Sequence, residues 1–199
     1  MFFKKLIRYL ILPVYKPFKG INDLTSERYK ITYSVLVFLF LGIIYTISVQ
    51  IAYSKGLGAV VKSFINIPAE NYYYWQRFYQ IPFFFLASIL FAGTASLMSI
   101  PFKGRGDFID IFCLLSISLT FPMLLTMWLP ETISFIFFPG KTIIPLWFDI
   151  GRQIAGIVWP LVISIIGISI IEKIRWYFSI IVVTVAAIPM TAMMVIFIR

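Results

Sequence analysis

This chain has 199 residues, of which 61% are hydrophobic and 13% are charged, and its formal net charge is +9. A soluble domain has about 25% charged residues, so the composition excludes a soluble fold. In a soluble protein, the positive charge would suggest a nucleic-acid partner. Here the Lys and Arg side chains stand beside long uncharged runs, so we expect lipid head groups as partners and no nucleic acid.

Five runs of the sequence are long and apolar enough to cross a bilayer. Because a helix rises about 1.5 Å per residue, roughly 20 apolar residues match a hydrocarbon core about 30 Å thick. The runs cover residues 31–52, 81–102, 111–129, 153–171 and 176–198. The sequence therefore predicts an all-α membrane protein, in which residues 31–199 form a bundle of five transmembrane helices and residues 1–30 precede it.

Residues 1–30 are expected to be a cytoplasmic segment with a short amphipathic helix that ends at Pro13. Apolar side chains fill one half of its helical wheel: Phe2, Phe3, Leu6, Ile7, Leu10 and Ile11. The other half carries Lys4, Lys5, Arg8 and Tyr9. Such a helix lies in the head-group plane of an anionic leaflet, or it packs against the cytoplasmic ends of the bundle. Both interpretations stay open. The candidate residues for binding lipid or a partner are Lys4, Lys5 and Arg8.

Basic side chains are unevenly distributed between the two sides of the predicted bundle. Eleven lie in residues 1–30 and in the turns 103–110 and 172–175, whereas six lie on the other side. The positive-inside rule then places the N-terminus in the cytoplasm, and five crossings place the C-terminus outside. We expect a multi-pass protein, located in the plasma (inner) membrane if the chain is prokaryotic.

Two connections contain segments that are too short to span. Residues 71–79 are rich in Tyr and Trp and are expected to form an interfacial helix that ends at Pro82. The loop 130–148 contains two apolar pieces, 132–138 and 142–148, which either form a re-entrant pair or cover the bundle as a lid.

Two features of the predicted spans bear on how the helices pack. Prolines inside the third, fourth and fifth spans are expected to kink their helices: Pro122, Pro160 and Pro189. Small side chains form one face of the second span: Ser88, Ala92, Ala95 and Ser99. We expect that face to pack inside the bundle because small residues let helices approach closely, with a homodimer as the alternative.

The sequence contains no histidine, which excludes Ser-His, Cys-His and His-metal sites. Asp107 and Asp110, at the start of the third span, are the best acidic pair, and two such carboxylates can hold a divalent metal ion. Gly104 and Gly106 favour instead a tight turn with Asp107 as the helix N-cap, which is the interpretation we prefer. We therefore assign no catalytic residue, no metal and no cofactor.

Strongly polar side chains are rare within the predicted spans. Gln50 and Gln153 lie near the outer ends of their spans and are candidates to line a polar cavity. An ionisable group at a helix centre costs about 2.5 to 3.5 kcal/mol, and none lies in the middle third of any predicted span. This pattern argues against an ion-coupled pump. Arg152, three residues after Asp149, is expected to pair locally.

Two local sequences resemble those of the Yip1 family of membrane proteins. Residues 74–82 read Tyr-Trp-Gln-Arg-Phe-Tyr-Gln-Ile-Pro and are similar to the aromatic approach to the second span in bacterial and archaeal members. Residues 104–108, which include Gly104, Gly106 and Asp107, are similar to their glycine-rich turn. Pro122 falls where these members often have a proline in the third span. The five-span layout after a cytoplasmic segment is also similar.

The resemblance implies a non-enzymatic integral membrane protein, with eukaryotic relatives linked to vesicle trafficking and to binding of prenylated Rab-type GTPases. This chain lacks the long polar N-terminal region of those relatives, which puts direct GTPase binding in doubt. We expect a protein that binds or organises anionic lipid or partner proteins in membrane trafficking or homeostasis. The protein partner would be a second copy or another membrane protein. The alternative is a small permease or channel for a solute or ion, which the proline kinks open past Gln50 and Gln153.

Overall fold

The computed structural model describes residues 2–58, 64, 67–138 and 145–197, without the side chains of Phe2 and Phe3. Helices account for 88% of the structure, and the described residues contain no strand. Five helical units are long and apolar enough to cross a membrane: Lys30–Ser54, Ala69–Phe102, Phe108–Phe137, Leu146–Glu172 and Trp176–Phe197. The predicted all-α bundle of five spans is therefore confirmed.

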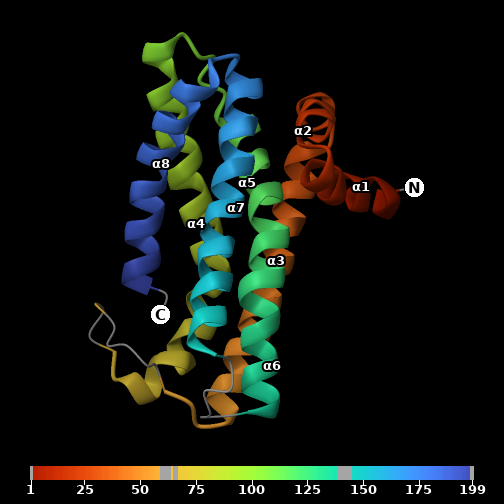
Figure 1. Cartoon of the computed structure of the whole chain (residues 1–199). Coiled ribbons are helices and arrows are strands. Elements are labelled where there is room, and N and C mark those ends of the chain that lie inside the picture. The colour runs from red at the N-terminus through yellow and green to blue at the C-terminus, as the bar shows by residue number, and fades with distance from the viewer. Residues whose placement is uncertain (1, 59–63, 65–66, 139–144, 198–199) are drawn as a thin grey trace.

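The spans run up and down beside one another and are joined by short connections at one end (Figure 1). The first span is α3 (Lys30–Ser54), and the second is α4 (Tyr72–Ser99) with a 3-10 turn at each end, η1 (Ala69–Asn71) and η2 (Ile100–Phe102). The fourth and fifth are α7 (Leu146–Glu172) and α8 (Trp176–Phe197). We call the end at which α3 begins the hairpin end, because the two helices formed by residues 2–26 lie there, and the opposite end the far end.

The third span combines three helical segments around two prolines. It begins as α5 (Phe108–Pro122), continues through the π-helical turn η3 (Met123–Trp128) and ends as α6 (Leu129–Phe137). In η3 the backbone N–H of Leu129 donates to the carbonyl of Leu124, five residues earlier. Pro122 and Pro130 flank this turn, and each lacks the N–H that a regular helix needs. By contrast, α7 and α8 stay α-helical through their prolines, Pro160 and Pro189.

Two predictions about the connections are wrong. The aromatic residues 71–79 do not form a separate interfacial helix, because α4 already begins at Tyr72 and continues through Pro82. Residues 132–137 are neither a re-entrant piece nor a lid, since they extend the third span as part of α6. In both places the continuous helix satisfies its own backbone groups, which a bilayer demands. Of the second apolar piece, 142–148, residues 142–144 lie outside the described residues, and residues 146–148 belong to α7.

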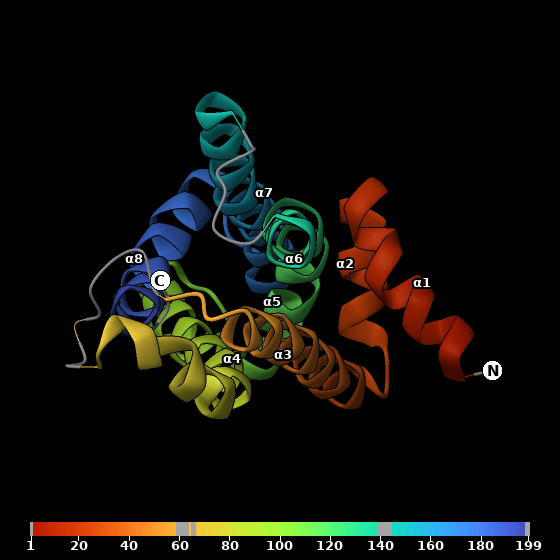
Figure 2. The ribbon, with the colours of Figure 1, turned by 90° about the horizontal axis from the view of Figure 1, so that it is seen from below.

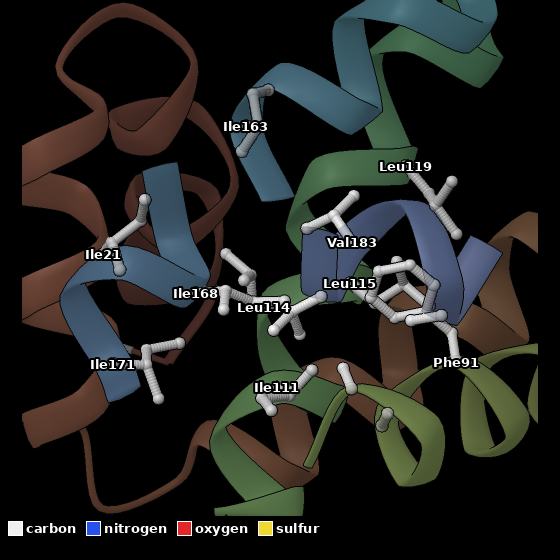
Figure 3. Close-up of a cluster of buried hydrophobic side chains, with 14 of the residues drawn as sticks. Ile21, Phe91, Ile111, Leu114, Leu115, Leu119, Ile163, Ile168, Ile171 and Val183 are labelled. Carbon is white, nitrogen blue, oxygen red and sulfur yellow. The ribbon is translucent and has the colours of Figure 1, made fainter. Parts of the chain in front are cut away.

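The core of the bundle surrounds α5, as Figure 3 shows. In the most apolar stretch of the third span 72% of the residues are buried, compared with 17% in α8. Leu114 of α5 packs so closely on α7 that a Cβ added to Gly167 would lie 2.3 Å from one of its methyl carbons. Side chains from four spans meet there: Phe91, Ile111, Leu114, Leu115, Ile168 and Val183. The small-residue face of α4, which includes Ala92 and Ala95, is buried inside this core, as expected.

Residues 2–26 form two helices, which we call the N-terminal hairpin. They are α1 (Phe2–Tyr15) and α2 (Pro17–Ser26), and Pro13 lies inside α1 and does not end it, contrary to the prediction. The helix continues because a proline removes only its own donor, and the N–H of Lys16 still donates to the carbonyl of Leu12 at 2.9 Å. Both helices run across the bundle axis and lie outside the group of spans (Figure 2).

The face of α1 that packs on the bundle is rotated from the apolar half of the helical wheel, of which Leu6 and Leu10 pack against the core. Tyr9, which the wheel places among the cations, is buried together with Leu12. Ile7 and Ile11, which belong to the apolar half, are 54% and 42% exposed. α2 contributes the buried side chains of Ile21 and Leu24 to the bundle core. α1 is therefore docked through one face and leaves an apolar stripe uncovered by protein.

Candidate functional site

The charged and polar groups of the hairpin end form the candidate site. The N-terminal hairpin, the starts of α3 and α5, and the ends of α4 and α7 all belong to this end (Figure 1). It contains most of the residues that the sequence singled out: Lys4, Lys5, Arg8, Gly104, Gly106, Asp107 and Asp110.

A buried polar cluster fastens α1 to the bundle. The hydroxyl oxygen of Ser34 lies 2.9 Å from that of Tyr9 and 3.0 Å from that of Ser116. The cluster therefore joins α1, α3 and α5, and the fully buried Cys113 lies in the same group of packed side chains. Burial raises the pKa of the Tyr9 phenol above its usual range, so it stays protonated and able to donate.

Lys30 connects the hairpin to the third span. Its ammonium donates to Asp110 Oδ1 and, at 3.2 Å, to the carbonyl of Thr25 at the end of α2. Both charged side chains are mostly buried, at 21% and 12% exposure. Asp110 therefore forms an ion pair with a residue that lies 80 positions earlier in the sequence.

Asp107 has a different function from Asp110. It is the N-cap of α5, because its carboxylate accepts the backbone N–H groups of Ile109 at 3.1 Å and Asp110 at 3.3 Å. This is the cap that the sequence favours over a shared metal site. Among the described residues, no three acidic or cysteine side chains are grouped so that they could hold a metal ion.

Glu172, at the end of α7, is a site residue that the sequence analysis missed. Its side chain is 0% exposed and accepts three hydrogen bonds: from the backbone N–H of Gly106 at 2.8 Å, from that of Asp107 at 3.2 Å and from the Ser99 hydroxyl at 3.2 Å. A Cβ added to Gly104 would lie 2.8 Å from the same carboxylate, and Gly106 has a φ of +67°. The glycines therefore let the turn close around Glu172.

The basic residues of α1 border a charged cleft. A cleft of about 300 Å³ opens between α1 and α2 and is lined by Lys5, Arg8, Asp23 and Glu27, among others. Arg8 pairs with Asp23 at 3.0 Å across it. Lys4 is exposed on α1 and does not line the cleft.

The two glutamines predicted to line a cavity have separate partners. Gln50 of α3 is exposed and accepts a hydrogen bond from Arg77 at 2.8 Å. Gln153 of α7 is exposed and donates to Asp149 at 2.9 Å. The structure does not bring them together. Because α4 begins nine residues earlier than predicted, two other glutamines are buried in it, with Gln76 donating to Gln80 at 3.1 Å.

Arg152 organises the far end of the bundle. It pairs with Asp149 at 2.6 Å, as expected, and also lies 3.8 Å from Glu131. One of its N–H groups donates to the carbonyl of Thr126 at 2.8 Å. In a regular helix, residue 130 would donate to that carbonyl, but it is a proline. Arg152 therefore fastens α7 to the irregular part of the third span.

Comparisons with protein-family models, with curated proteins and with solved structures find no match for this chain. The resemblance to the Yip1 family stays a prediction from the sequence.

Proposed function

We propose that this chain is a non-enzymatic, Yip1-type integral membrane protein that binds or organises anionic lipid through its N-terminal hairpin. The observation that carries the proposal is the placement of α1 and α2, which run across the bundle axis beside the spans (Figure 2). A helix in that position lies parallel to the membrane plane, as amphipathic helices at the head-group boundary do.

The exposed side chains of the hairpin support contact with lipid. Ile7 and Ile11 of α1 and Phe18 of α2 are uncovered by protein, and Phe18 is 66% exposed. Lysines stand among them and are exposed as well: Lys4, Lys16 and Lys19. Each such cation contributes about 1 kcal/mol of attraction to an anionic leaflet. Exposed apolar side chains and exposed cations within the same two helices suit the boundary between acyl chains and head groups.

The distribution of charge supports a cytoplasmic location for the hairpin end. Lys103, Arg105, Lys173 and Arg175 lie in the short turns at this end, beside the cations of the hairpin. The positive-inside rule then orients this end toward the cytoplasm and the far end outward, in the plasma (inner) membrane if the chain is prokaryotic. Anionic lipid is concentrated in the cytoplasmic leaflet, where the hairpin would meet it.

The bonding of the other polar groups supports a binding protein over a permease or an enzyme. Asp107 caps a helix, Asp110 pairs with Lys30, and Gln50 and Gln153 bond to separate neighbours at the far end. The two carboxylates serve helix capping and an ion pair at the hairpin end. A role in membrane trafficking or homeostasis, with a second copy or another membrane protein as partner, belongs to the same proposal.

The proposal is tested by lipid retention. The protein is reconstituted into nanodiscs of equal parts phosphatidylglycerol and phosphatidylcholine, extracted gently, and its retained lipid is measured by native mass spectrometry. The wild type is expected to retain phosphatidylglycerol preferentially. The triple variant Lys4→Gln, Lys16→Gln, Lys19→Gln is expected to lose that preference about tenfold or more, since three attractions of about 1 kcal/mol are removed.

A matched control is Lys55→Gln, which removes an exposed lysine that follows α3 at the far end. It is expected to retain lipid like the wild type. Equal retention of phosphatidylglycerol by the wild type and the triple variant would refute the proposed function.

A further inference from the structure

The cleft between α1 and α2 contains charges of both signs. Lys5 and Arg8 contribute two cations from α1, while Asp23 of α2 and Glu27, directly after α2, contribute two carboxylates. Its volume of about 300 Å³ is at the lower end of the range for small-molecule sites, which suits a head group better than a larger ligand. A site with two opposite charges is complementary to a zwitterion.

One cation and one carboxylate of the cleft have no ionic partner among the described residues. The ammonium of Lys5 makes no hydrogen bond or ion pair there, and the carboxylate of Glu27 accepts only the backbone N–H of Tyr29 at 3.4 Å. Arg8 and Asp23 pair with each other, but both are exposed, at 66% and 46%, and such surface pairs are weak. The guanidinium of Arg8 also has donors left over, because it carries five N–H groups.

The floor of the cleft is built from tightly packed groups. A Cβ on Gly20 of α2 would lie 2.5 Å from the backbone nitrogen of Pro13, so the two helices touch at this point. Tyr9 lines the cleft, and its hydroxyl is already bonded to Ser34.

The lining of the cleft favours one kind of ammonium group over another. A quaternary ammonium is usually recognised by a cage of several aromatic rings. This cleft offers carboxylates instead, which prefer a primary ammonium that can donate hydrogen bonds.

We propose that the cleft binds the phosphoethanolamine head group of a phospholipid, with the phosphate on Lys5 and Arg8 and the primary ammonium on Glu27 and Asp23. This inference rests on the proposed function, in which the hairpin lies at the head-group boundary. The lipid is favoured over free phosphoethanolamine because exposed apolar side chains, Ile7 and Ile11, stand on the same helix as the two cations.

The test compares lipids that differ only in the amine. Nanodiscs contain equal parts phosphatidylethanolamine and phosphatidylcholine, and the retained lipids are counted by native mass spectrometry. The wild type is expected to retain phosphatidylethanolamine about tenfold over phosphatidylcholine. Glu27→Gln is expected to bring the ratio close to one, and Lys5→Gln to lower the retention of both lipids. Lys55→Gln, which removes an exposed lysine at the far end and outside the cleft, is the matched control and is expected to keep the wild-type ratio.

Three results would overturn the inference: a ratio near one in the wild type, a wild-type ratio in Glu27→Gln, or displacement of the lipid by millimolar free phosphoethanolamine, which would assign the site to the soluble compound. Protection of the buried Cys113 from a maleimide dye confirms that each variant is folded. Retention of phosphatidylglycerol is measured for the same variants in separate nanodiscs of phosphatidylglycerol and phosphatidylcholine, as in the test of the proposed function. Glu27→Gln is expected to lose the preference for phosphatidylethanolamine and to keep the retention of phosphatidylglycerol. This result would distinguish the head-group site in the cleft from the general binding of anionic lipid by the hairpin.

Discussion

The buried carboxylate of Glu172 provides the sharpest test of how the hairpin end is held together. In the variant Glu172→Gln an amide nitrogen replaces one of the two carboxylate oxygens, while the shape of the side chain is kept. All three present partners of Glu172 are donors: the N–H groups of Gly106 and Asp107 and the hydroxyl of Ser99. An NH₂ group can accept none of them, so at least one buried donor loses its acceptor.

The expected loss follows from the number of bonds. A buried donor without an acceptor costs about 1 to 3 kcal/mol, and each remaining bond weakens by roughly 1 kcal/mol when the acceptor becomes neutral. The neutral side chain is cheaper to bury, which offsets part of this loss. We expect the free energy of unfolding to fall by about 2 to 3 kcal/mol. The control Glu70→Gln makes the same chemical change at an exposed position and should stay within about 0.5 kcal/mol of the wild type.

The single cysteine of the chain serves as the reporter. Cys113 is completely buried in α5, so a maleimide dye labels it only when the bundle opens. Labelling is followed in mixed micelles of increasing sodium dodecyl sulfate content, for the wild type, Glu172→Gln and Glu70→Gln. Glu172→Gln is expected to be labelled at a clearly lower content of the denaturing detergent. If its midpoint coincides with those of the wild type and the control, the carboxylate does not stabilise the turn and the reasoning fails.

Three further variants test the other contacts with the same assay. Lys30→Gln should lower the free energy of unfolding by about 2 kcal/mol because Asp110 loses its ion-pair partner, and the double variant with Asp110→Asn should recover part of it; equal loss in both would contradict the pairing. Gly20→Ala should cost about 1 to 3 kcal/mol, since its methyl group meets the backbone of Pro13, and a neutral result would mean that α1 shifts freely. Arg152→Gln should cost about 2 kcal/mol because the carbonyl of Thr126 loses its donor and Glu131 loses its cation, while Asp149 keeps only the hydrogen bond from Gln153; a stability equal to the wild type would exclude the role of Arg152 at the far end.

The number of spans could be predicted because lipid imposes a length on every crossing. The first and last residues of the spans were harder to predict from the sequence, as the start of α4 shows. The stretch that precedes Pro82 contains Gln76, Arg77 and Gln80, which read as polar interface in the sequence. In the fold the two glutamines are buried, and the guanidinium of Arg77 lies over the ring of Tyr74 at 4.3 Å. Arg77 also donates to Gln50 of α3 at 2.8 Å, so partners on the same helix and on a neighbouring span allow α4 to begin nine residues earlier than predicted.

The docking face of α1 depends on partners that only the fold brings together. A helical wheel places Tyr9 among the cations because positions 5, 8 and 9 fall on the same half of the helix. The bundle buries it because Ser34 and Ser116, from two different spans, offer both space and hydrogen bonds. The cap at Asp107 was predictable for the opposite reason, since all its partners lie within three residues.

Glu172 could not be recognised from the sequence because two of its three donors are backbone groups. The amides of Gly106 and Asp107 lie 66 and 65 residues away along the chain, and a backbone amide leaves no mark in a sequence. The available signal was an acidic residue at the end of a span, opposite a turn that contains two glycines. In other membrane proteins, that combination would predict a buried carboxylate that accepts hydrogen bonds from the turn.

The π-helical turn η3 gives the third span two orientations within one crossing. A π-helical turn holds one residue more than an α-helical turn, so the side chains that follow it are rotated by about 100° relative to a regular helix. Beyond the turn, the hydroxyl oxygen of Thr132 in α6 lies 2.7 Å from that of Ser48 in α3. The last residue of the turn, Trp128, donates its indole N–H to the carbonyl of Ile44 at 3.0 Å. The same crossing thus forms the centre of the bundle before the turn and packs on α3 beyond it, so removing one residue from the turn would set these two halves out of phase.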